Sequence, residues 1–452
     1  MKKDKVVILG AGITGLVTAY YFSQNKNFEV TLIEKEKYVG GTAFSFEYNG
    51  FVLDYGPHKI YTELPGIIDE ISNITPLIKI KKKNSIYLKG NLFDFPLKIS
   101  QIATKMPLTA INSGIDIFTK SFTSLPDDSY ENYLINRFGK TLYGLSFRDY
   151  AQKVWSSNPR ELDKELAIKR VAVSNIFELI KGILLKDTKK ISAEYFYYPP
   201  KGIKQPLDNL VIKIKEKGGQ ILTGKEISEI KIKDYKLKYF KLGNKIIKPD
   251  YLISTIHLNS LLNVINDSKK SENLVNSANR LTYQKVSIIY LILNKERAMR
   301  NCWIFFPEKK LFFHRISEQK AFSEHTSPKD KTCLMVETTK ELTKENIERI
   351  ISQLQKLKIL NKDEIIEYIV KTKNNVYPIY KKGFLQNLQP IISYLENIEN
   401  FYTIGRPGLF NYNNMDQCWD MAKKTYEQIR DKRSKKEWQK TKEYFEKYRI
   451  VD

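Results

Sequence analysis

Three glycines and one acidic residue near the start of the chain have the types and spacing that bind a dinucleotide. Gly10, Gly12 and Gly15 form the segment GAGITG, and Glu34 follows 19 residues after Gly15. In such a pattern the first glycine permits a tight turn, the second lets the backbone approach a pyrophosphate, and the third lets a helix pack on a strand. The acid accepts hydrogen bonds from ribose hydroxyls. The predicted contacts are Gly10, Gly12, Ile13, Thr14, Gly15, Glu34 and Lys35.

The residues around these glycines predict the elements that the motif needs. Lys5–Leu9 (KVVIL) has the apolar pattern of a buried parallel strand, and Leu16–Gln24 can continue as a helix. Phe28–Glu34 predicts a second strand that ends in the acid. The N-terminus of the helix then faces the phosphates with free N–H groups. The sequence therefore predicts a Rossmann-type nucleotide domain at this end of the chain.

A second glycine pair, Gly40 and Gly41, precedes Thr42 in the run GGTAFSFEYNGFVLDYGPH. Such a pair lets another backbone stretch pass close to the same cofactor. With GAGITG and the acid, it resembles the FAD-binding half of the flavoprotein group that holds amine oxidases, protoporphyrinogen oxidases and UDP-galactopyranose mutases. The resemblance implies that the cofactor is FAD. In amine oxidases the flavin-linking cysteine follows a Ser-Gly pair, which does not precede Cys418, so we expect noncovalent FAD.

The segment GRPGLFNYNNMD, residues 405–416, is the second strong motif. It resembles the C-terminal flavin segment of the mutases, in which a Gly-Arg pair precedes an aromatic residue, a Tyr and a Met-Asp that opens a helix. The resemblance implies that Arg406 touches FAD and that Tyr412 lies near substrate phosphates. The mutases have an acid where Asn414 stands here. The cofactor contacts implied by this segment are Gly405, Arg406, Asn414, Met415 and Asp416.

Three further residues carry the resemblance toward the substrate. Gly-Pro-His at residues 56–58 matches the mutases, and it implies that His58 lies near the flavin and tunes its electronics. The stretch YAQKVWSSNPRELDKELAIKRV, residues 150–171, implies that Trp155 forms a wall of a sugar pocket. In the same stretch Arg170 would bind a pyrophosphate, for which a planar bidentate donor is suited. His58, Arg170, Trp155 and Tyr412 are the candidate catalytic residues.

Two departures keep the function open between two enzymes. The mutases have a Tyr-Arg pair where Tyr283-Gln284 stands, and residues 198–202 (YPPKG) are more similar to the Tyr-Pro-x-x-Gly loop of protoporphyrinogen oxidases. One hypothesis is therefore a flavoenzyme that acts on a nucleotide sugar in surface glycan synthesis. The other is an oxidoreductase like protoporphyrinogen oxidase or amine oxidase. A flavin-binding protein without turnover is a third possibility.

The pattern of elements predicts an α/β fold in which a Rossmann-type FAD domain is interleaved with a mixed helical and antiparallel-sheet substrate domain. Apolar runs such as Tyr251–Thr255 and Phe401–Gly405 predict strands that return to the nucleotide domain, whereas Lys362–Thr372 predicts a helix. The predicted FAD-binding domain comprises residues 1–90, 203–262 and 396–430, the substrate domain residues 91–202 and 263–395, and a basic helical tail residues 431–452.

Composition limits the partners of the chain. Hydrophobic residues make up 42% of its 452 residues, so a sizeable core can form. The net charge of +24 favours anionic partners such as nucleotides or phosphosugars, and we expect no nucleic acid. The basic tail is either a solvated surface helix or a peripheral contact with an anionic membrane. Three unpaired cysteines and histidines without ligand spacing indicate a reducing cytoplasm and no metal.

Overall fold

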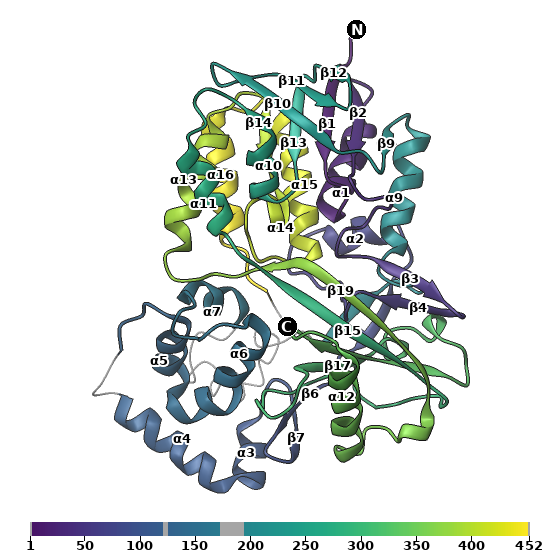
Figure 1. Ribbon diagram of the computed structural model, residues 1–452, viewed down its shortest axis with the longest axis vertical. Helices are drawn as coiled ribbons and strands as arrows, with labels where there is room; N and C mark the ends of the chain where they lie inside the picture. The colour runs from purple at the N-terminus through teal and green to yellow at the C-terminus, as the bar shows by residue number, and fades with distance from the viewer. Residues whose placement is uncertain (1, 121–124, 172–193, 451–452) are drawn as a thin grey trace.

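The computed structural model describes residues 2–120, 125–171 and 194–450, and it contains the predicted nucleotide domain (Figure 1). Its centre is a five-stranded sheet in the order β20-β13-β1-β2-β9, in which every strand pair is parallel. The strands are β1 (Asp4–Leu9), β2 (Phe28–Ile33), β9 (Gln220–Leu222), β13 (Tyr251–Ser254) and β20 (Phe401–Thr403). The strands predicted at Lys5–Leu9 and Phe28–Glu34 are thus confirmed, and so is the α/β class.

Helices cover this parallel sheet. Helix α1 (Ile13–Ser23) follows β1 directly and packs against α9 (Gln205–Glu216) and α15 (Met415–Arg430). Val6 and Ile8 of β1 share a buried core with α1, whereas Val7 and Leu9 lie in a second core on the other face of the sheet. The strand is thus shielded on both faces, as is usual in parallel sheets. The segment 405–416 leads from β20 through α14 (Gly405–Gly408) to the start of α15, as the sequence predicted.

A second, seven-stranded sheet lies beside the nucleotide domain in the order β19-β15-β18-β17-β16-β6-β7. Its pairs are antiparallel except for β16 with β6. Its strands are β6 (Asn84–Leu88), β7 (Asn91–Asp94), β15 (Tyr283–Leu293), β16 (Trp303–Phe305), β17 (Arg315–Glu318), β18 (Thr332–Thr338) and β19 (Ile365–Pro378). The hairpin of β6 and β7 crosses the domain boundary predicted at residue 90, because both strands join this sheet.

The helix predicted at Lys362–Thr372 is wrong. Only Lys362–Glu364 forms a short 3-10 turn, and Ile365–Pro378 is the long edge strand β19, which pairs with β15. The residues Ile365, Tyr368, Ile369 and Val370 are β-branched or aromatic, and such residues favour the pleated surface of a sheet. Pairing with the mostly apolar neighbour β15 therefore decides between helix and strand.

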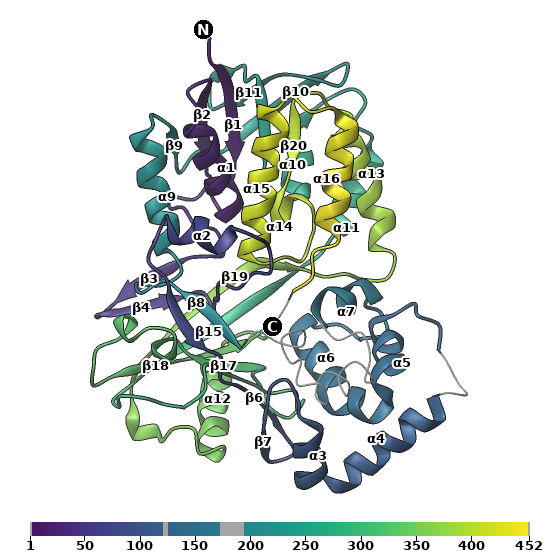
Figure 2. The same cartoon turned by 180° about the vertical axis from the view of Figure 1, so that it is seen from behind.

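A cluster of helices extends from this sheet at the end of the molecule opposite the parallel sheet (Figures 1 and 2). It comprises α3 (Ile99–Lys105), α4 (Pro107–Lys120), α5 (Tyr130–Tyr143), a π-helical turn (Gly144–Arg148), α6 (Asp149–Trp155) and α7 (Lys164–Arg170). These helices agree with the helical part of the predicted mixed fold, and residues 121–124 and 172–193 lie outside the described residues.

Smaller elements complete the molecule. Three small sheets contain β10 (Ile227–Lys233), β11 (Lys236–Leu242), β12 (Lys245–Ile247) and β14 (Ile265–Asn266); β3 (Ser45–Tyr48) and β4 (Phe51–Asp54); and β5 (Ile78–Lys81) and β8 (Tyr195–Tyr198). The remaining α-helices are α2 (Ile67–Ser72), α10 (Leu258–Val264), α11 (Glu272–Arg280), α12 (Lys344–Lys356), α13 (Phe384–Glu396) and α16 (Lys435–Glu446). The predicted domain boundaries stay a prediction.

Candidate active site

The first glycine motif forms the tight turn that its spacing predicts. Gly10 has a φ of +94°, a conformation that L side chains rarely adopt. A Cβ added to Gly15 would lie 1.8 Å from the Gly10 carbonyl oxygen, so helix α1 can approach strand β1 only because Gly15 has no side chain. A Cβ at Gly12 would meet nothing within 4 Å. The open space above Gly12 is where the motif lets a pyrophosphate approach.

The second glycine pair packs against this turn. Gly40 donates its N–H to the Ala11 carbonyl over 2.8 Å and forms a parallel bridge with Gly12. A Cβ at Gly41 would lie 3.3 Å from the Cα of Gly12, which is a tight contact. The two glycine segments therefore present adjacent stretches of backbone to the same space.

Glu34 closes this end of the site. One of its carboxylate oxygens accepts the N–H of Ala11 at 2.7 Å, and the other accepts the N–H of Glu36 at 2.9 Å. An ionised carboxylate can accept about four hydrogen bonds, so these two leave capacity for ribose hydroxyls. The same contacts fix the orientation of the side chain at the end of β2.

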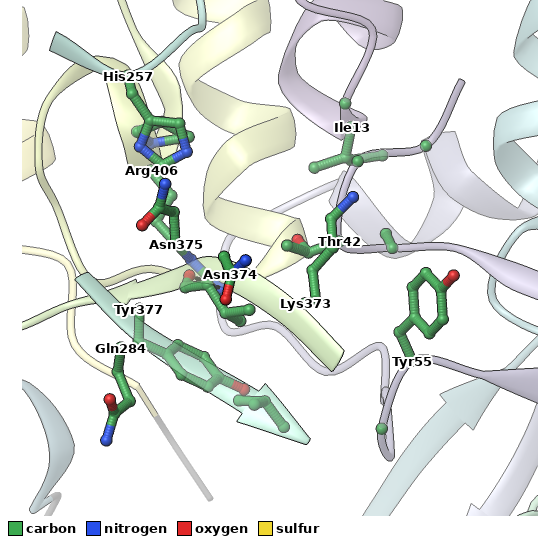
Figure 3. A pocket seen from close by; sticks show the side chains of 18 of the residues that line it. Ile13, Thr42, Tyr55, His257, Gln284, Lys373, Asn374, Asn375, Tyr377 and Arg406 are labelled. Carbon is green, nitrogen blue, oxygen red and sulfur yellow. Dashed lines mark hydrogen bonds between the residues drawn. The ribbon is translucent and has the colours of Figure 1, made fainter. Parts of the chain in front are cut away.

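A cavity of about 670 Å³ extends from the glycine turn to the seven-stranded sheet. Figure 3 shows Ile13 and Thr42 at one end and Gln284 and Tyr377 at the other. Its lining includes fifteen of the predicted site residues: Gly10, Gly12, Ile13, Thr14, Glu34, Lys35, Gly40, Gly41, Thr42, His58, Arg170, Arg406, Tyr412, Asn414 and Met415. The cavity thus brings together residues from both ends of the chain.

Four predicted site residues lie behind this lining. Gly15 and Gly405 act through packing, since a Cβ on Gly405 would lie 2.8 Å from the Thr14 hydroxyl oxygen. Asp416 is buried in the first turn of α15, and burial raises its pKa to about 6. Trp155 is 2% exposed and supports the lining aromatics from behind.

Two arginines converge on an aromatic cluster at the inner end of the cavity. The Arg170 guanidinium lies 5.6 Å from the ring centre of Trp155 and 5.3 Å from that of Tyr412. The Arg406 guanidinium lies 5.7 Å from the ring centre of Tyr412 and 5.1 Å from that of Tyr377. The Tyr377 and Tyr412 rings stack with centres 5.3 Å apart. The result is an aromatic surface flanked by two guanidinium groups, as cation–π attraction favours.

Backbone carbonyls hold Arg406. It donates to the Asn413 carbonyl through Nε at 3.1 Å and also through Nη2, and to the Val376 carbonyl at 3.4 Å. Carbonyl oxygens orient a guanidinium group without cancelling its charge. Arg406 therefore adds a fixed positive charge beside Tyr412.

His58 lies in the lining, and its Nδ1 is 3.0 Å from the Gly56 carbonyl oxygen. The pKa of His58 is lowered to about 4, mainly by burial and also by the charges of Arg406 and Arg315, while the Gly56 contact opposes this shift. His58 is therefore neutral at pH 7. Because a carbonyl can only accept, Nδ1 carries the proton and Nε2 is an acceptor.

A buried ion pair packs beneath the Gly56–His58 loop. Arg315 on β17 and Glu337 on β18 are paired in register and form a double hydrogen bond, with 2.9 Å between Nη2 and Oε1. A Cβ on Gly56 would lie 3.1 Å from the Glu337 carboxylate. This pair fixes the floor of the cavity and places one more guanidinium near His58.

Gln284 stands where the resemblance to the mutases implies an arginine. Its Nε2 donates to the Val154 carbonyl at 2.6 Å and to the Ser156 hydroxyl at 2.9 Å. The side chain is 6% exposed and links β15 to the end of α6. Gln284 thus stabilises the wall that carries Trp155 and adds no charge to the cavity.

The sequence prediction missed several lining residues on β19, among them Lys371, Lys373, Asn374 and Asn375. Figure 3 shows Lys373, Asn374 and Asn375 facing the cavity between Thr42 and Arg406. Lys371 lies in the segment predicted to be helical, and the other three residues follow it directly, so no strand was predicted there. The β-branched and aromatic residues between Ile365 and Val370 were the signal that could have indicated a strand here.

Cys418 also lines the cavity, two residues after Asp416. Its thiol lies 3.3 Å from the Asn413 side-chain oxygen, and burial raises its pKa. A protonated thiol is a poor nucleophile. In the part of the chain that the structure describes, no group of three His, Cys, Asp or Glu side chains is arranged to hold a metal ion.

Comparison with known proteins agrees with this geometry. Residues 8–67 match the family model of an NAD(P)-binding Rossmann-like domain. A dTDP-fucopyranose mutase of Escherichia coli is 26% identical over 179 residues, which cover 38% of this chain and 46% of that protein. A coproporphyrinogen III oxidase of Staphylococcus aureus is 27% identical over 273 residues, or 52% of this chain and 57% of that protein. The chain thus spans about half the length of these relatives.

Solved structures extend the likeness to nearly the whole chain. A reduced UDP-galactopyranose mutase superposes with a TM-score of 0.80 at 20% identity, covering 95% of this chain and 94% of that one. The chain has the fold of this flavoprotein group. A putative protoporphyrinogen oxidase from Exiguobacterium superposes with a TM-score of 0.75 at 17% identity, covering 95% and 99%. The predicted fold and the predicted resemblance are both confirmed.

The residues of the cavity fit FAD, the cofactor that the resemblance predicts. The open space above Gly12, the backbone of Gly40 and Gly41, and the Glu34 carboxylate suit a pyrophosphate with an adjoining ribose. The N-terminus of α15 at Met415 also faces the cavity, and such a terminus offers free N–H groups. The cavity continues beyond these groups to the aromatic cluster, which leaves room for a substrate.

Proposed function

We propose that the chain is an FAD-dependent flavoenzyme that acts on a nucleotide sugar. One observation carries this proposal: Arg170 and Arg406, which are far apart in sequence, flank Tyr412 in a cavity continuous with the glycine turn. Planar guanidinium groups bind phosphate oxygens in pairs of hydrogen bonds, so two of them suit a diphosphate. The relatives named as mutases of UDP- and dTDP-linked sugars support the same class of substrate.

The aromatic cluster accounts for the uncharged part of such a substrate. Tyr377 and Tyr412 stack with each other and present ring faces and hydroxyl groups beside the arginines. Aromatic faces pack against the apolar faces of sugars and bases, while phenol hydroxyls can hydrogen-bond to sugar hydroxyls. Trp155, packed against Tyr412 at 5.7 Å between ring centres, holds this surface in place from behind.

His58 is the residue of the chain best suited to act beside the reacting atoms. With its pKa near 4 it is neutral at pH 7, and its Nε2 can accept a hydrogen bond or a proton. When bound, reduced FAD supplies a nucleophilic nitrogen for the anomeric carbon of a sugar, whereas oxidised FAD supplies a hydride acceptor. The protein positions the substrate, excludes water by burying the cluster, and holds the proton of His58 on Nδ1.

The second candidate is an oxidoreductase like protoporphyrinogen oxidase. Gln284 favours it, because this side chain takes the place of an arginine in the mutases and uses its amide to bind Val154 and Ser156. Asn414 favours it too, because the mutases have an acid there. The relative named coproporphyrinogen III oxidase also supports an oxidoreductase.

The redox state needed for turnover tests the proposal. Purified protein is incubated with a UDP-hexose or a dTDP-deoxyhexose in two forms, as isolated in air and after chemical reduction without oxygen. We expect only the reduced protein to convert a sugar nucleotide, and its flavin should still be reduced afterwards. Chromatography measures the conversion. Bleaching of the oxidised flavin by a reduced porphyrin, with no conversion of any sugar nucleotide, would establish the oxidoreductase instead.

A further inference from the structure

His314 lies on the wall of the cavity that the seven-stranded sheet forms, directly before Arg315 in the chain. The residue is 6% exposed, and its ring packs edge to face against that of Tyr150 with centres 6.3 Å apart. Among the residues that the structure describes, no group hydrogen-bonds to either nitrogen of this ring. Buried polar side chains nearly always have a hydrogen-bond partner. Because His314 lines the cavity, a bound molecule can supply the missing partner.

Two backbone hydrogen bonds fix the position of His314. Its N–H donates to the Glu337 carbonyl at 3.0 Å, and its carbonyl accepts the N–H of Phe306 at 2.9 Å. These bonds join the start of β17 to β18 and to the residue that follows β16. A side chain on such a rigid element keeps its direction when a ligand binds. The ring is therefore held in place before any substrate enters.

The surroundings of His314 keep its ring uncharged. Burial is the main cause that lowers its pKa well below 6.5, and the charges of Arg315, Lys153 and Arg170 lower it too. A neutral imidazole has one donor nitrogen and one acceptor nitrogen. A hydroxyl group likewise donates and accepts, so it can bond to this ring in either tautomer. The ring thus matches a hydroxyl group better than an anionic group.

The polar groups beside His314 already have partners within the protein. Arg315 is bound to Glu337, so the two opposite charges are paired. Gln284 donates the N–H groups of its amide to a carbonyl and to a hydroxyl of the chain. The Thr339 hydroxyl donates to a backbone carbonyl at 2.6 Å. The His314 ring, by contrast, keeps its hydrogen-bonding capacity for a ligand.

Two neighbours of His314 indicate which part of a nucleotide sugar it meets. Arg170 lies close enough for its charge to act on His314, and together with Arg406 it suits the diphosphate. Arg315 acts in the same way on His58, which the proposed function places beside the reacting atoms. His314 therefore lies between the diphosphate and the reacting side of the cavity. In a nucleotide sugar the hexose is the part that extends from the diphosphate to the reacting atoms.

We propose that His314 hydrogen-bonds to a hydroxyl group of the hexose and thereby selects the sugar of the nucleotide-sugar substrate. This inference rests on the proposed function, since a porphyrin has no sugar hydroxyl to offer. It assigns the recognition of the sugar to a residue other than those that hold the diphosphate. His314 should therefore matter for the binding of a sugar nucleotide and not for the binding of UDP.

Calorimetric titration of the FAD-loaded full chain with UDP and with UDP-galactose tests the inference. His314→Phe keeps an aromatic ring against Tyr150 but cannot hydrogen-bond, so it should bind UDP-galactose roughly tenfold more weakly and UDP as the wild type does. His314→Gln keeps a donor and an acceptor and should recover most of the lost affinity. The matched control His325→Phe changes an exposed histidine outside the cavity lining and should bind both ligands like the wild type.

Monodeoxy analogues of UDP-galactose identify the hydroxyl without any change to the protein. The wild type should bind one of them roughly tenfold more weakly than UDP-galactose, whereas His314→Phe should bind that analogue and UDP-galactose equally. Equal binding of UDP-galactose and every analogue by the wild type would overturn the inference and leave the proposed function intact. So would an unchanged affinity of His314→Phe for UDP-galactose, or an equal loss of its affinity for UDP. A wild type that binds neither UDP nor UDP-galactose would contradict the proposed function and this inference with it.

Discussion

The two ends of the cavity are built in different ways. The cofactor end is made of backbone from two nearby segments, Gly10–Gly15 and Gly40–Thr42, with one carboxylate from Glu34. The substrate end is made of side chains from α7, β15, β19 and residues 405–416. A backbone cradle tolerates change elsewhere in the chain, whereas a composite pocket alters its specificity with single substitutions. The family model matches residues 8–67, which form the cofactor end of the cavity. It does not reach the residues of the substrate end, so the identity of the substrate stays a proposal.

The largest expected effect separates two glycines of the same turn. Gly15→Val should prevent folding, because even a Cβ there would lie 1.8 Å from a backbone oxygen; we expect a loss of about 3 kcal/mol or more. Gly12→Val should fold, because a Cβ there meets nothing within 4 Å, but it should lose FAD by filling the space for the pyrophosphate. Thermal unfolding and flavin absorbance measure both effects.

The matched control for this pair is Gly66→Ala. Gly66 lies outside the cavity lining and has open space around it, although its φ of +77° adds some strain. It should lower stability modestly and leave FAD binding intact. A folded Gly12→Val protein that keeps its full FAD content would break the distinction between the two glycines.

At the substrate end, Arg170→Ala should weaken binding of UDP or dTDP roughly tenfold to hundredfold, because a hydrogen bond to a charged group is lost. Flavin fluorescence during titration measures the affinity. Arg160→Ala is the control, since that side chain is 76% exposed, pairs with the buried Glu131 and lies outside the cavity lining. Equal affinities of wild type and Arg170→Ala, or no binding of either nucleotide, would remove the main support for a nucleotide sugar.

Most residues that the sequence predicts for the cofactor end lie together in the cavity, because the signals that predict them are local. Gly10, Gly12, Gly15 and Glu34 lie within one strand-helix-strand unit, so their spacing already determines their geometry. The substrate end needed the tertiary fold. Lys373 was missed because it directly follows a segment predicted to be helical, whereas pairing with β15 makes the whole segment a strand. That Trp155 lies behind Tyr412 depends on packing between segments more than two hundred residues apart.

A third prediction concerns the buried His58. Its folded pKa of about 4 lies below its ordinary value of 6.5, so the unfolded chain binds more protons between these values. The stabilising contribution is complete above pH 6.5 and is lost as the pH falls toward 4. The difference in unfolding free energy between wild type and His58→Gln should therefore narrow by up to about 1.4 kcal/mol per pH unit in this window.

The wild type must be compared with His58→Gln because other groups also titrate between pH 4 and 6.5. Burial raises the pKa of Asp54 and Asp416 to about 6, which acts in the opposite direction, but both are present in each protein. Chemical denaturation at a series of pH values supplies the data. Parallel pH curves for wild type and His58→Gln would show that His58 is not held neutral by burial.

The smallest expected effect on stability is that of Asn414→Asp. Asn414 is the N-cap of α15, and Asp caps helices about as well as Asn, so we expect a change below about 0.5 kcal/mol in the free energy of unfolding. The variant restores the acid of the mutases and should raise sugar turnover by the reduced protein. A large loss of stability, or turnover that falls, would show that this position has a different role here.

FAD content is the most direct test of the central claim, that the two glycine segments and Glu34 form a cradle for noncovalent FAD. The purified protein is denatured, and the supernatant and the precipitate are analysed separately by chromatography and mass spectrometry. The account predicts a yellow protein that releases stoichiometric FAD into the supernatant. Release of NAD alone, flavin that stays attached to the precipitated chain, or no nucleotide even after FAD is added during purification would contradict it.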